Sequence, residues 1–432
     1  MADILIKNGL ILPMTDGATI LRGYSILAEN GKIASVGKNI TGKVEEVIDA
    51  RGKLVMPGLV NAHTHLPMTL FRGVADDMDL MPWLQTKIWP LEKKLNAKRV
   101  RAGALLGCLE MIKSGTTCFA DMYFFMEEVA KAVEDSGLRG VLSYGMIEKG
   151  SSVLRALELK KSQGFIKKWH GKAEGRVTAM FGPHSTYTCS EKCLREVKRL
   201  SEKMGIGVHI HLAENDDDVK ETKKLTGETP VRLLHKIGLL GPDVLAAHCV
   251  RVSPEEIKML SKSGTSVAHN PTSNMKLASG MAPVAECLRA GVNVCLGTDG
   301  AASNNSLDMF WEMKVCALMG KLREDDPKVL SAPEVLEMAT VNGAKALGLY
   351  DIGTIEPGKR CDLIMIDLSS PHLKPLHNPA SHLVYSARGS DVDTVIVDGK
   401  IVMRDRRVLT LDEEKVVEMA EKASTELLEA AK

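Results

Sequence analysis

Two histidines separated by one residue close an apolar segment near the start of the chain. His63 and His65 end the run LVMPGLVNAHTH. Side chains two residues apart on a strand point to the same face, so both imidazoles are expected on one side. Paired imidazoles at a strand end suit a borderline-soft divalent metal such as zinc. The pair alone is a moderate indication, because histidines with this spacing are more often surface or packing residues.

More polar side chains stand at or just past the ends of other apolar runs along the chain. They are His184, His209, His211, Glu214, His248, His269 and Asp299. In a (β/α)₈ barrel the carboxyl ends of all the strands meet at one face, which is where active sites form. This placement favours one shared site over unrelated residues.

The segment VHIHLAEN offers a third imidazole ligand, His211, with the carboxylate of Glu214 over the metal. His209 lies deeper along the strand and can simply fill a layer of the barrel, so we leave it out of the site. Asp299 closes the run VCLGTDG, where an aspartate could merely cap the next helix. We expect it to be a ligand, because a carboxylate compensates the metal's charge and can take a proton from a bound water.

Two further histidines end apolar runs. His248, in LAAHCV, is placed to orient a metal-bound water and stabilise the hydroxide, although a satisfied core histidine is the alternative. His269, in VAHNPTSNMKLASG, is expected to line the pocket.

The elements that must position these residues alternate along the middle of the chain. Eight apolar β-type runs, separated by helical segments such as 127–137, 191–205 and 284–291, predict a (β/α)₈ TIM-type barrel, an α/β fold, over residues 57–350. Residues 1–56 and 351–432 hold short alternating runs broken at Asn-Gly, Gly-Lys and Asp-Gly turns. They predict a small β-sandwich domain formed from both chain termini, with an amphipathic helix at the C-terminal end.

The composition is that of an ordinary globular protein. A formal net charge of +1 and the lack of a basic block give no indication of nucleic acid or an anionic membrane surface. No apolar run approaches the length of a membrane span, and the start MADILIKNGL lacks a signal-peptide pattern. We therefore expect a cytoplasmic protein without a membrane partner, whose nine scattered cysteines are reduced.

Five motifs in order resemble the metal-dependent amidohydrolase superfamily: PGLVNAHTH, IHLAEN, AAHCV, AHNPTSNMKLASG and LGTDGAASNN. More narrowly, they are similar to its branch of 5′-methylthioadenosine/S-adenosylhomocysteine deaminases and 5′-deoxyadenosine deaminases. The resemblance implies hydrolytic removal of the adenine 6-amino group from adenosine 5′-derivatives, and a homo-oligomer. It also implies one divalent metal per subunit, zinc with Fe²⁺ as the alternative, held by His63, His65, His211 and Asp299.

The resemblance further implies roles for residues around the metal. Glu214 is expected to carry the proton to the purine ring, and His184 to contact the nucleoside substrate. The run GPHSTYT has no lysine that could bridge a second metal. Trp83 and Glu92 match positions that hold the ribose, whose diol offers two O–H donors to a carboxylate.

One position departs from the relatives that favour S-adenosylhomocysteine. These are expected to place an arginine at the end of the third barrel strand for the amino-acid carboxylate, and here Tyr144 aligns with it in LSYGM. A tyrosine cannot offer the charged bidentate fork, although Arg139 or Arg155 could compensate. The sequence thus predicts a preference for small uncharged 5′ groups.

Other functions stay open at this point. The same site could deaminate another ring, such as guanine or a triazine, or cut a cyclic amide. A non-catalytic scaffold of the same fold is the alternative from a different class, but such a chain is expected to have lost ligands that this sequence keeps.

Overall fold

The computed structural model describes residues 3–40 and 44–430, so the outermost residues of the predicted terminal ranges lie outside it. Within this part of the chain, eight strands pair in sequence order, each parallel to the next. The strands are β8 (Leu59–Thr64), β9 (Thr116–Tyr123), β10 (Arg139–Met146), β11 (Val177–Pro183), β12 (Val208–Leu212), β13 (Val244–His248), β14 (Ser266–His269) and β15 (Val294–Leu296). The predicted (β/α)₈ barrel is confirmed.

The barrel closes where the end of β15 meets β8. The backbone N–H of Asp299 donates to the carbonyl of His63 at 2.9 Å, and the Asn61 side chain bonds Thr298. A Cβ at Gly297 would lie 2.8 Å from the backbone of His63, so only glycine permits this approach. The seam therefore brings the first and last strand-end motifs together.

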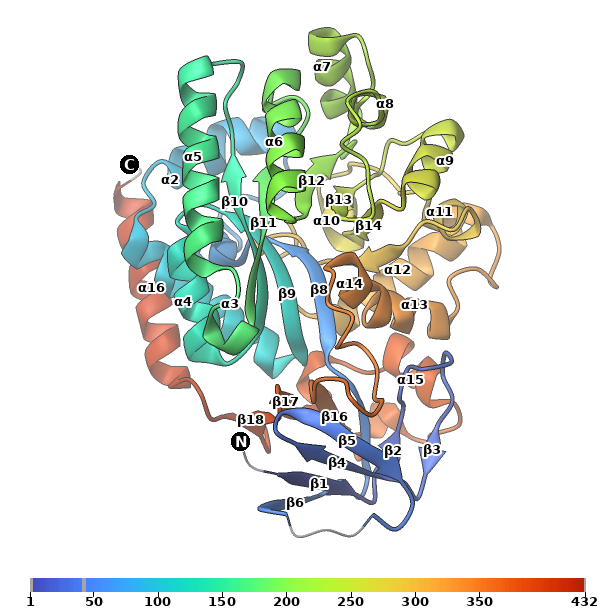
Figure 1. Ribbon diagram of the computed structural model, residues 1–432. Coiled ribbons are helices and arrows are strands. Elements are labelled where there is room, and N and C mark those ends of the chain that lie inside the picture. The colour runs from blue at the N-terminus through green and yellow to red at the C-terminus, as the bar shows by residue number, and fades with distance from the viewer. Residues whose placement is uncertain (1–2, 41–43, 431–432) are drawn as a thin grey trace.

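Helices surround the strands (Figure 1). Several of them begin at a capping residue and end at a glycine in the left-handed conformation. Helix α6, for example, has Ser190 as its N-terminal cap and Gly205 at its C-terminal end. The described helices around the barrel are α3 (Ala97–Lys113), α4 (Met126–Ser136), α5 (Ser152–Trp169), α6 (Glu191–Met204), α7 (Asp216–Thr226), α8 (Pro230–Lys236), α9 (Pro254–Ser263), α10 (Pro271–Lys276), α11 (Val284–Arg289), α12 (Met309–Glu324), α13 (Ala332–Met338) and α14 (Val341–Ala346).

Two more sheets pack against each other at the amino-terminal end of the barrel strands (Figure 1). One consists of β5 (Lys32–Gly37), β4 (Ser25–Glu29), β1 (Ile4–Lys7) and β6 (Glu46–Asp49). The other consists of β19 (Arg407–Val408), β18 (Lys400–Arg404), β17 (Val392–Val397), β16 (Leu363–Asp367), β7 (Lys53–Pro57), β2 (Leu10–Ile11) and β3 (Leu21–Arg22). Because β7 pairs antiparallel with β16, both chain ends build this unit, as predicted. The division into 1–56, 57–350 and 351–432 stays a prediction.

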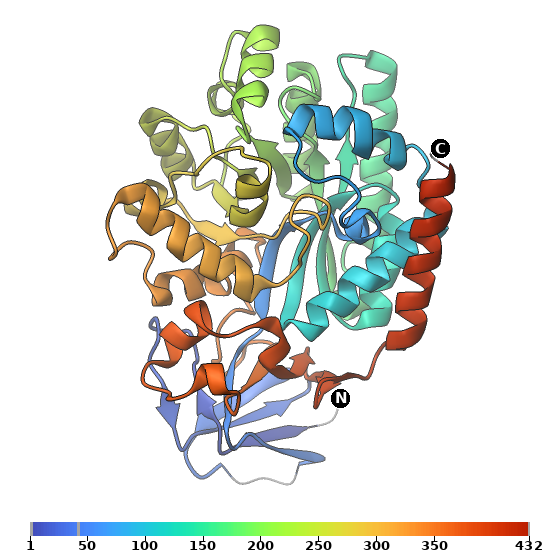
Figure 2. The same ribbon diagram turned by 180° about the vertical axis from the view of Figure 1, so that it is seen from behind.

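The C-terminal region returns to the barrel after the sandwich. Helix α15 (Pro379–Tyr385) packs against α12 and α13, and helix α16 (Glu413–Ala430) lies along α3, as Figure 2 shows. The Ser424 hydroxyl donates to the carbonyl of Leu70 at 2.9 Å. Leu70 belongs to η1 (Leu66–Phe71), which directly follows His65, so α16 helps to fix the segment that leaves the first site motif.

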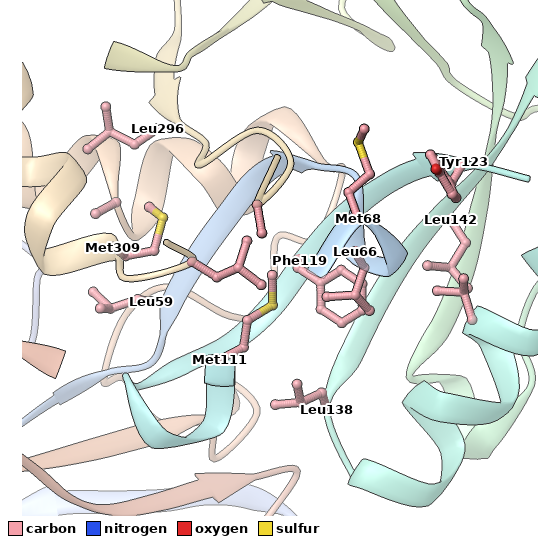
Figure 3. Close-up of a cluster of buried hydrophobic side chains, with 14 of the residues drawn as sticks. Leu59, Leu66, Met68, Met111, Phe119, Tyr123, Leu138, Leu142, Leu296 and Met309 are labelled. Atoms are coloured by element: carbon pink, nitrogen blue, oxygen red, sulfur yellow. The ribbon is translucent and has the colours of Figure 1, made fainter. Parts of the chain in front are cut away.

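The side chains between strands and helices form a continuous apolar layer. In the cluster of Figure 3, Phe119 and Leu142 from adjacent strands lie among Leu66, Met111 and Leu138, all fully buried. Such close packing makes the interior nearly incompressible and helps to keep the strand ends in place. No helix in the described ranges is long and apolar enough to cross a membrane.

Candidate metal centre and active site

The four predicted metal ligands converge at the carboxyl ends of the strands. His63 and His65 leave the end of β8, and Asp299 follows β15; its Oδ1 lies 3.4 Å from His63 Nε2 and 3.3 Å from His65 Nε2. His211, on β12, places its Nε2 3.2 Å from Nε2 of His65. Residues more than 200 positions apart in the sequence thus surround one point.

The hydrogen bonds of two of these histidines identify their tautomers. Nδ1 of His65 lies 2.6 Å from the carbonyl of Met122, and Nδ1 of His211 lies 2.7 Å from the carbonyl of His184. A carbonyl oxygen only accepts, so each Nδ1 must carry the hydrogen. Both Nε2 atoms therefore direct lone pairs at each other across 3.2 Å, a repulsive arrangement that a cation between them would stabilise.

His63 and Asp299 complete the same donor set. Among the described residues, neither His63 Nε2 nor Asp299 Oδ1 has a hydrogen-bond partner, although both atoms are buried. Burial lowers the pKa of His63 to about 4 and also lowers the pKa values of His65 and His211, so these imidazoles are neutral. Three neutral imidazoles and one carboxylate are a donor set that fits zinc or Fe²⁺.

His209, which the sequence analysis left out of the site, lies directly behind His63. Its Nε2 is 2.8 Å from Nδ1 of His63, inside the barrel, so it helps to set the tautomer and ring orientation of that ligand. Its position two residues before His211, on the same strand face, was the only signal for this role in the sequence.

His248 ends β13 and faces the same point as the four ligands. One ring nitrogen from each of His248, His63 and His211 lies within 4.8 Å of the other two. His248 could therefore also hold the metal. Nδ1 lies 2.9 Å from Oδ1 of Asn274, which turns Nε2 toward the site. Burial lowers the pKa of His248, but the neighbouring carboxylates of Glu214 and Asp299 raise it above its ordinary value.

The backbone is strained where it presents the site residues. His248 has φ of 74° and Asp299 has φ of 61°, both in the left-handed region that non-glycine residues rarely adopt. Ala213, just before Glu214, has φ of 51°. Such residues cost about 1–3 kcal/mol each and gather at functional sites. Nothing in the sequence signalled these turns.

A cavity opens above the four predicted ligands, with about 700 Å³ of empty space, part of which is open solvent. All four predicted substrate contacts, Trp83, Glu92, His184 and Glu214, line it. The segment after η1 forms one wall, through α1 (Leu80–Trp83), η2 (Leu84–Ile88) and α2 (Trp89–Glu92). The cavity is also lined by four residues for which the sequence indicated no role in binding: Trp89, Tyr123, Tyr187 and Ser303.

The polar groups of the cavity differ in whether they are free to bind a ligand or exchange a proton. The indole N–H of Trp83 donates to the carbonyl of Ala75 at 3.0 Å, so Trp83 can contact a ligand only through its ring. Burial raises the pKa of Glu92 to about 7 and that of Glu214 to about 7. Both carboxyls can therefore gain or lose a proton near neutral pH.

The expectation for Tyr144 is wrong. On β10 the Ser143 side chain points into the barrel, 3.5 Å from His209, so the next side chain points outward. Tyr144 lies against α5, with Lys161 Nζ 5.8 Å from its ring, and does not line the cavity. The inference of a preference for uncharged 5′ groups therefore loses its basis.

Three other expectations near the site are also wrong. Arg139 is the first residue of β10, at the end of the strand opposite the site, and Arg155 lies on the outer helix α5. Arg139 is buried in a pair with Asp362, with an N–O distance of 3.0 Å, and Arg155 pairs with Glu196 at 3.3 Å, so neither reaches the cavity. His269 is fully buried but is not among the residues that line the cavity.

Comparison with known proteins agrees with this fold. The model of the amidohydrolase family matches residues 54–402. The chain is 52% identical to a 5′-deoxyadenosine deaminase from Methanosarcina acetivorans, over 100% of both chains. It is 50% identical to a 5-methylthioadenosine/S-adenosylhomocysteine deaminase from Pelotomaculum thermopropionicum, over 99% of both chains.

Among solved structures, an adenosine deaminase from Xanthomonas campestris with bound zinc has a TM-score of 0.94, with 34% identity and 98% of each chain covered. The chain belongs to the amidohydrolase family. Within that family it is an enzyme, a hydrolytic deaminase, and the scaffold alternative is set aside.

Proposed function

We propose that this deaminase removes the 6-amino group of adenosine 5′-derivatives, 5′-deoxyadenosine among them, and releases ammonia and the inosine analogue. The observation that carries the proposal is the set of facing lone pairs on His65, His211 and Asp299, directly below a cavity lined by Glu92 and Glu214. The names of the relatives support the choice of an adenine nucleoside. We also propose a homo-oligomer, as the family resemblance implies, and a cytoplasmic location, as expected from the sequence.

His63, His65, His211 and Asp299 would hold the metal, zinc or Fe²⁺. When bound, it would supply a water whose pKa lies near 7 instead of about 15.7. Asp299 accepts the proton of the attacking water at a carboxylate oxygen. His248 orients that water through Nε2, because its Nδ1 is engaged with Asn274.

Glu214 delivers a proton to the purine ring. Its pKa of about 7, raised by burial, lets it carry a proton near neutral pH, unlike an exposed glutamate. Protonation of the ring nitrogen localises the double bonds as water attacks C6. Asp299 then gives the proton taken from water to the amino group, which leaves as ammonia, and the C6 hydroxyl returns a proton to Glu214 as the carbonyl forms. Asp299 and Glu214 thus start in opposite protonation states.

Glu92 provides a pH-dependent contact to the ribose. As the pH rises through about 7, Glu92 loses its proton and becomes an acceptor for both hydroxyls of the diol. The KM of a ribonucleoside is therefore expected to fall between pH 6 and pH 8, by up to about tenfold, which is the change in the ionised fraction of such a group. Steady-state kinetics at each pH measures this fall.

Glu92→Gln should keep a flat KM over that range, and so should the wild-type enzyme with a 2′,3′-dideoxy substrate, which lacks the diol. An equal fall in KM for the variant would show that another group is responsible.

Tyr144→Phe is expected to change the ratio of kcat/KM for S-adenosylhomocysteine and 5′-deoxyadenosine by less than about twofold. Tyr144 packs outside the barrel, and substitutions away from a site are usually worth less than about 0.5 kcal/mol. The measurement is ammonia release with both substrates. A larger change in the ratio would return Tyr144 to a role in substrate choice.

The test of the function is ammonia release and loss of adenine absorbance from metal-loaded protein. The panel is 5′-deoxyadenosine, 5′-methylthioadenosine, S-adenosylhomocysteine, adenosine and guanine. Turnover of the adenosine derivatives supports the proposal, and their ranking identifies the favoured 5′ group. Turnover of guanine alone, or none with metal bound, would favour the guanine, triazine or cyclic-amide alternatives.

A further inference from the structure

The two oxygens of the Asp299 carboxylate have different surroundings. Oδ2 accepts hydrogen bonds from the hydroxyls of Ser273 and Ser303, each at 2.6 Å. Oδ1 has no hydrogen-bond partner in the described part of the chain and lies 3.3 Å from Nε2 of His65. A carboxylate oxygen offers about two lone-pair positions, so the two serines fill those of Oδ2.

We propose that Ser273 and Ser303 are positioning residues that fix the Asp299 carboxylate, so that Oδ1 alone is presented to the metal. A free carboxylate can rotate and share both oxygens with a cation. Two donors on one oxygen prevent this rotation, and all three residues are at most 5% exposed. The proposal depends on the proposed function only for its rate measurement.

The two segments that carry the serines, helix α10 and the loop after β15, are joined by one buried carboxylate. Oε1 of Glu312, on α12, accepts from the side-chain amide of Asn304 at 2.7 Å, and Oε2 accepts from the backbone N–H of Thr272 at 3.2 Å. Asn304 follows Ser303, and Thr272 precedes Ser273. Glu312 therefore holds both hydroxyls on the same side of Asp299.

The two serine hydroxyls differ in whether a second hydrogen-bond acceptor lies within reach. The Ser303 hydroxyl also lies 3.0 Å from the carbonyl of Gly300, and Ser303 lines the cavity, whereas the described contacts of the Ser273 hydroxyl are with Asp299 alone. When Asp299 takes the proton of the attacking water on Oδ2, the Ser303 O–H can turn to Gly300. Its oxygen then accepts the new O–H of Asp299. Ser303 thus has a part in turnover as well as in positioning.

The first experiment measures metal binding without turnover. Metal-free protein is titrated with Co²⁺, whose visible absorption depends on the number and geometry of its ligands. The variants are Ser273→Ala, Ser303→Ala, the double variant, and Ser279→Ala as the matched control. Ser279 lies just after helix α10, which carries Ser273. It is 3% exposed, and its hydroxyl has no partner among the described residues.

The double variant is expected to bind Co²⁺ at least about tenfold more weakly and with an altered spectrum, as is typical for loss of groups that orient a ligand. Ser279→Ala should match wild type. Wild-type affinity and spectrum in the double variant would overturn the proposal. If the double variant does not fold, the single variants provide the test, since each should show part of the loss of Co²⁺ affinity and part of the change in the spectrum.

The second experiment compares rates at saturating metal. Ser303→Ala is expected to lower kcat more than Ser273→Ala does, and Ser303→Thr, which keeps the hydroxyl, should recover most of the loss. Equal losses of kcat in the two alanine variants would contradict the proposed role of Ser303 in turnover. If wild type itself turns over no adenosine derivative, the proposed function fails, while the Co²⁺ titration still tests the positioning of Asp299.

Discussion

Replacing Glu214 by glutamine is expected to lower kcat about 10³-fold, within the range that general acid–base groups contribute. Glutamine keeps the size and polarity of the side chain but has no proton to deliver to the ring. Glu214 lines the cavity, and burial raises its pKa to about 7, which is what a proton carrier at neutral pH requires. Ammonia release under saturating substrate measures the loss.

Metal content and substrate affinity should stay at wild-type values in Glu214→Gln, because the proposed ligands and the ribose contact are untouched. Metal analysis and calorimetric titration of the variant with substrate check both. Glu202→Gln is the matched control: this residue lies on α6, pairs with Lys198 and does not line the cavity, so its substitution should change kcat less than about twofold. Near-normal turnover in Glu214→Gln would remove Glu214 from the proton transfer.

Removal of the metal by a chelator is expected to lower the rate of deamination to less than about one thousandth of the rate of the metal-loaded enzyme. Water with a pKa of about 15.7 is a far poorer source of hydroxide at neutral pH than water with a pKa of about 7. The melting temperature should fall as well, because a ligand at 1,000 times its Kd stabilises the native state by about 4 kcal/mol. Activity and thermal unfolding, followed as Zn²⁺ or Fe²⁺ is returned, measure both effects.

Asp299→Ala provides the comparison for metal removal. This variant lacks the single anionic donor of the proposed set, so added Zn²⁺ should restore neither its rate nor its stability to wild-type values. Full activity in protein that metal analysis shows to be metal-free would refute a metal-dependent reaction.

The barrel and the arrangement of its strand ends could be predicted because they depend on local patterns. Alternation over two residues showed that His63 and His65 share a face, and the repeated order of apolar run and helix indicated a (β/α)₈ barrel. In such a barrel all strand ends meet, so residues as distant as His65 and Asp299 could be assigned to one site. Their actual distance of 3.3 Å follows from the closed seam between β8 and β15.

The direction of individual side chains was harder to predict. Tyr144 was assigned to the cavity by alignment, yet the register of β10 turns Ser143 inward and Tyr144 outward. A shift of one residue in such an assignment moves a side chain to the other face of the sheet. The sequence alone does not show which of these two adjacent side chains faces the interior of the barrel.

Residue type and spacing were enough to predict the fold class, the strand-end motifs and the residues most suited to hold a metal. How these residues are held could be seen only in the folded chain: the lone pairs of His65 and His211 face each other, His209 lies behind His63, and two serines donate to Asp299. Hydrogen bonds depend on atoms within about 3 Å, and these atoms come from segments that only folding brings together.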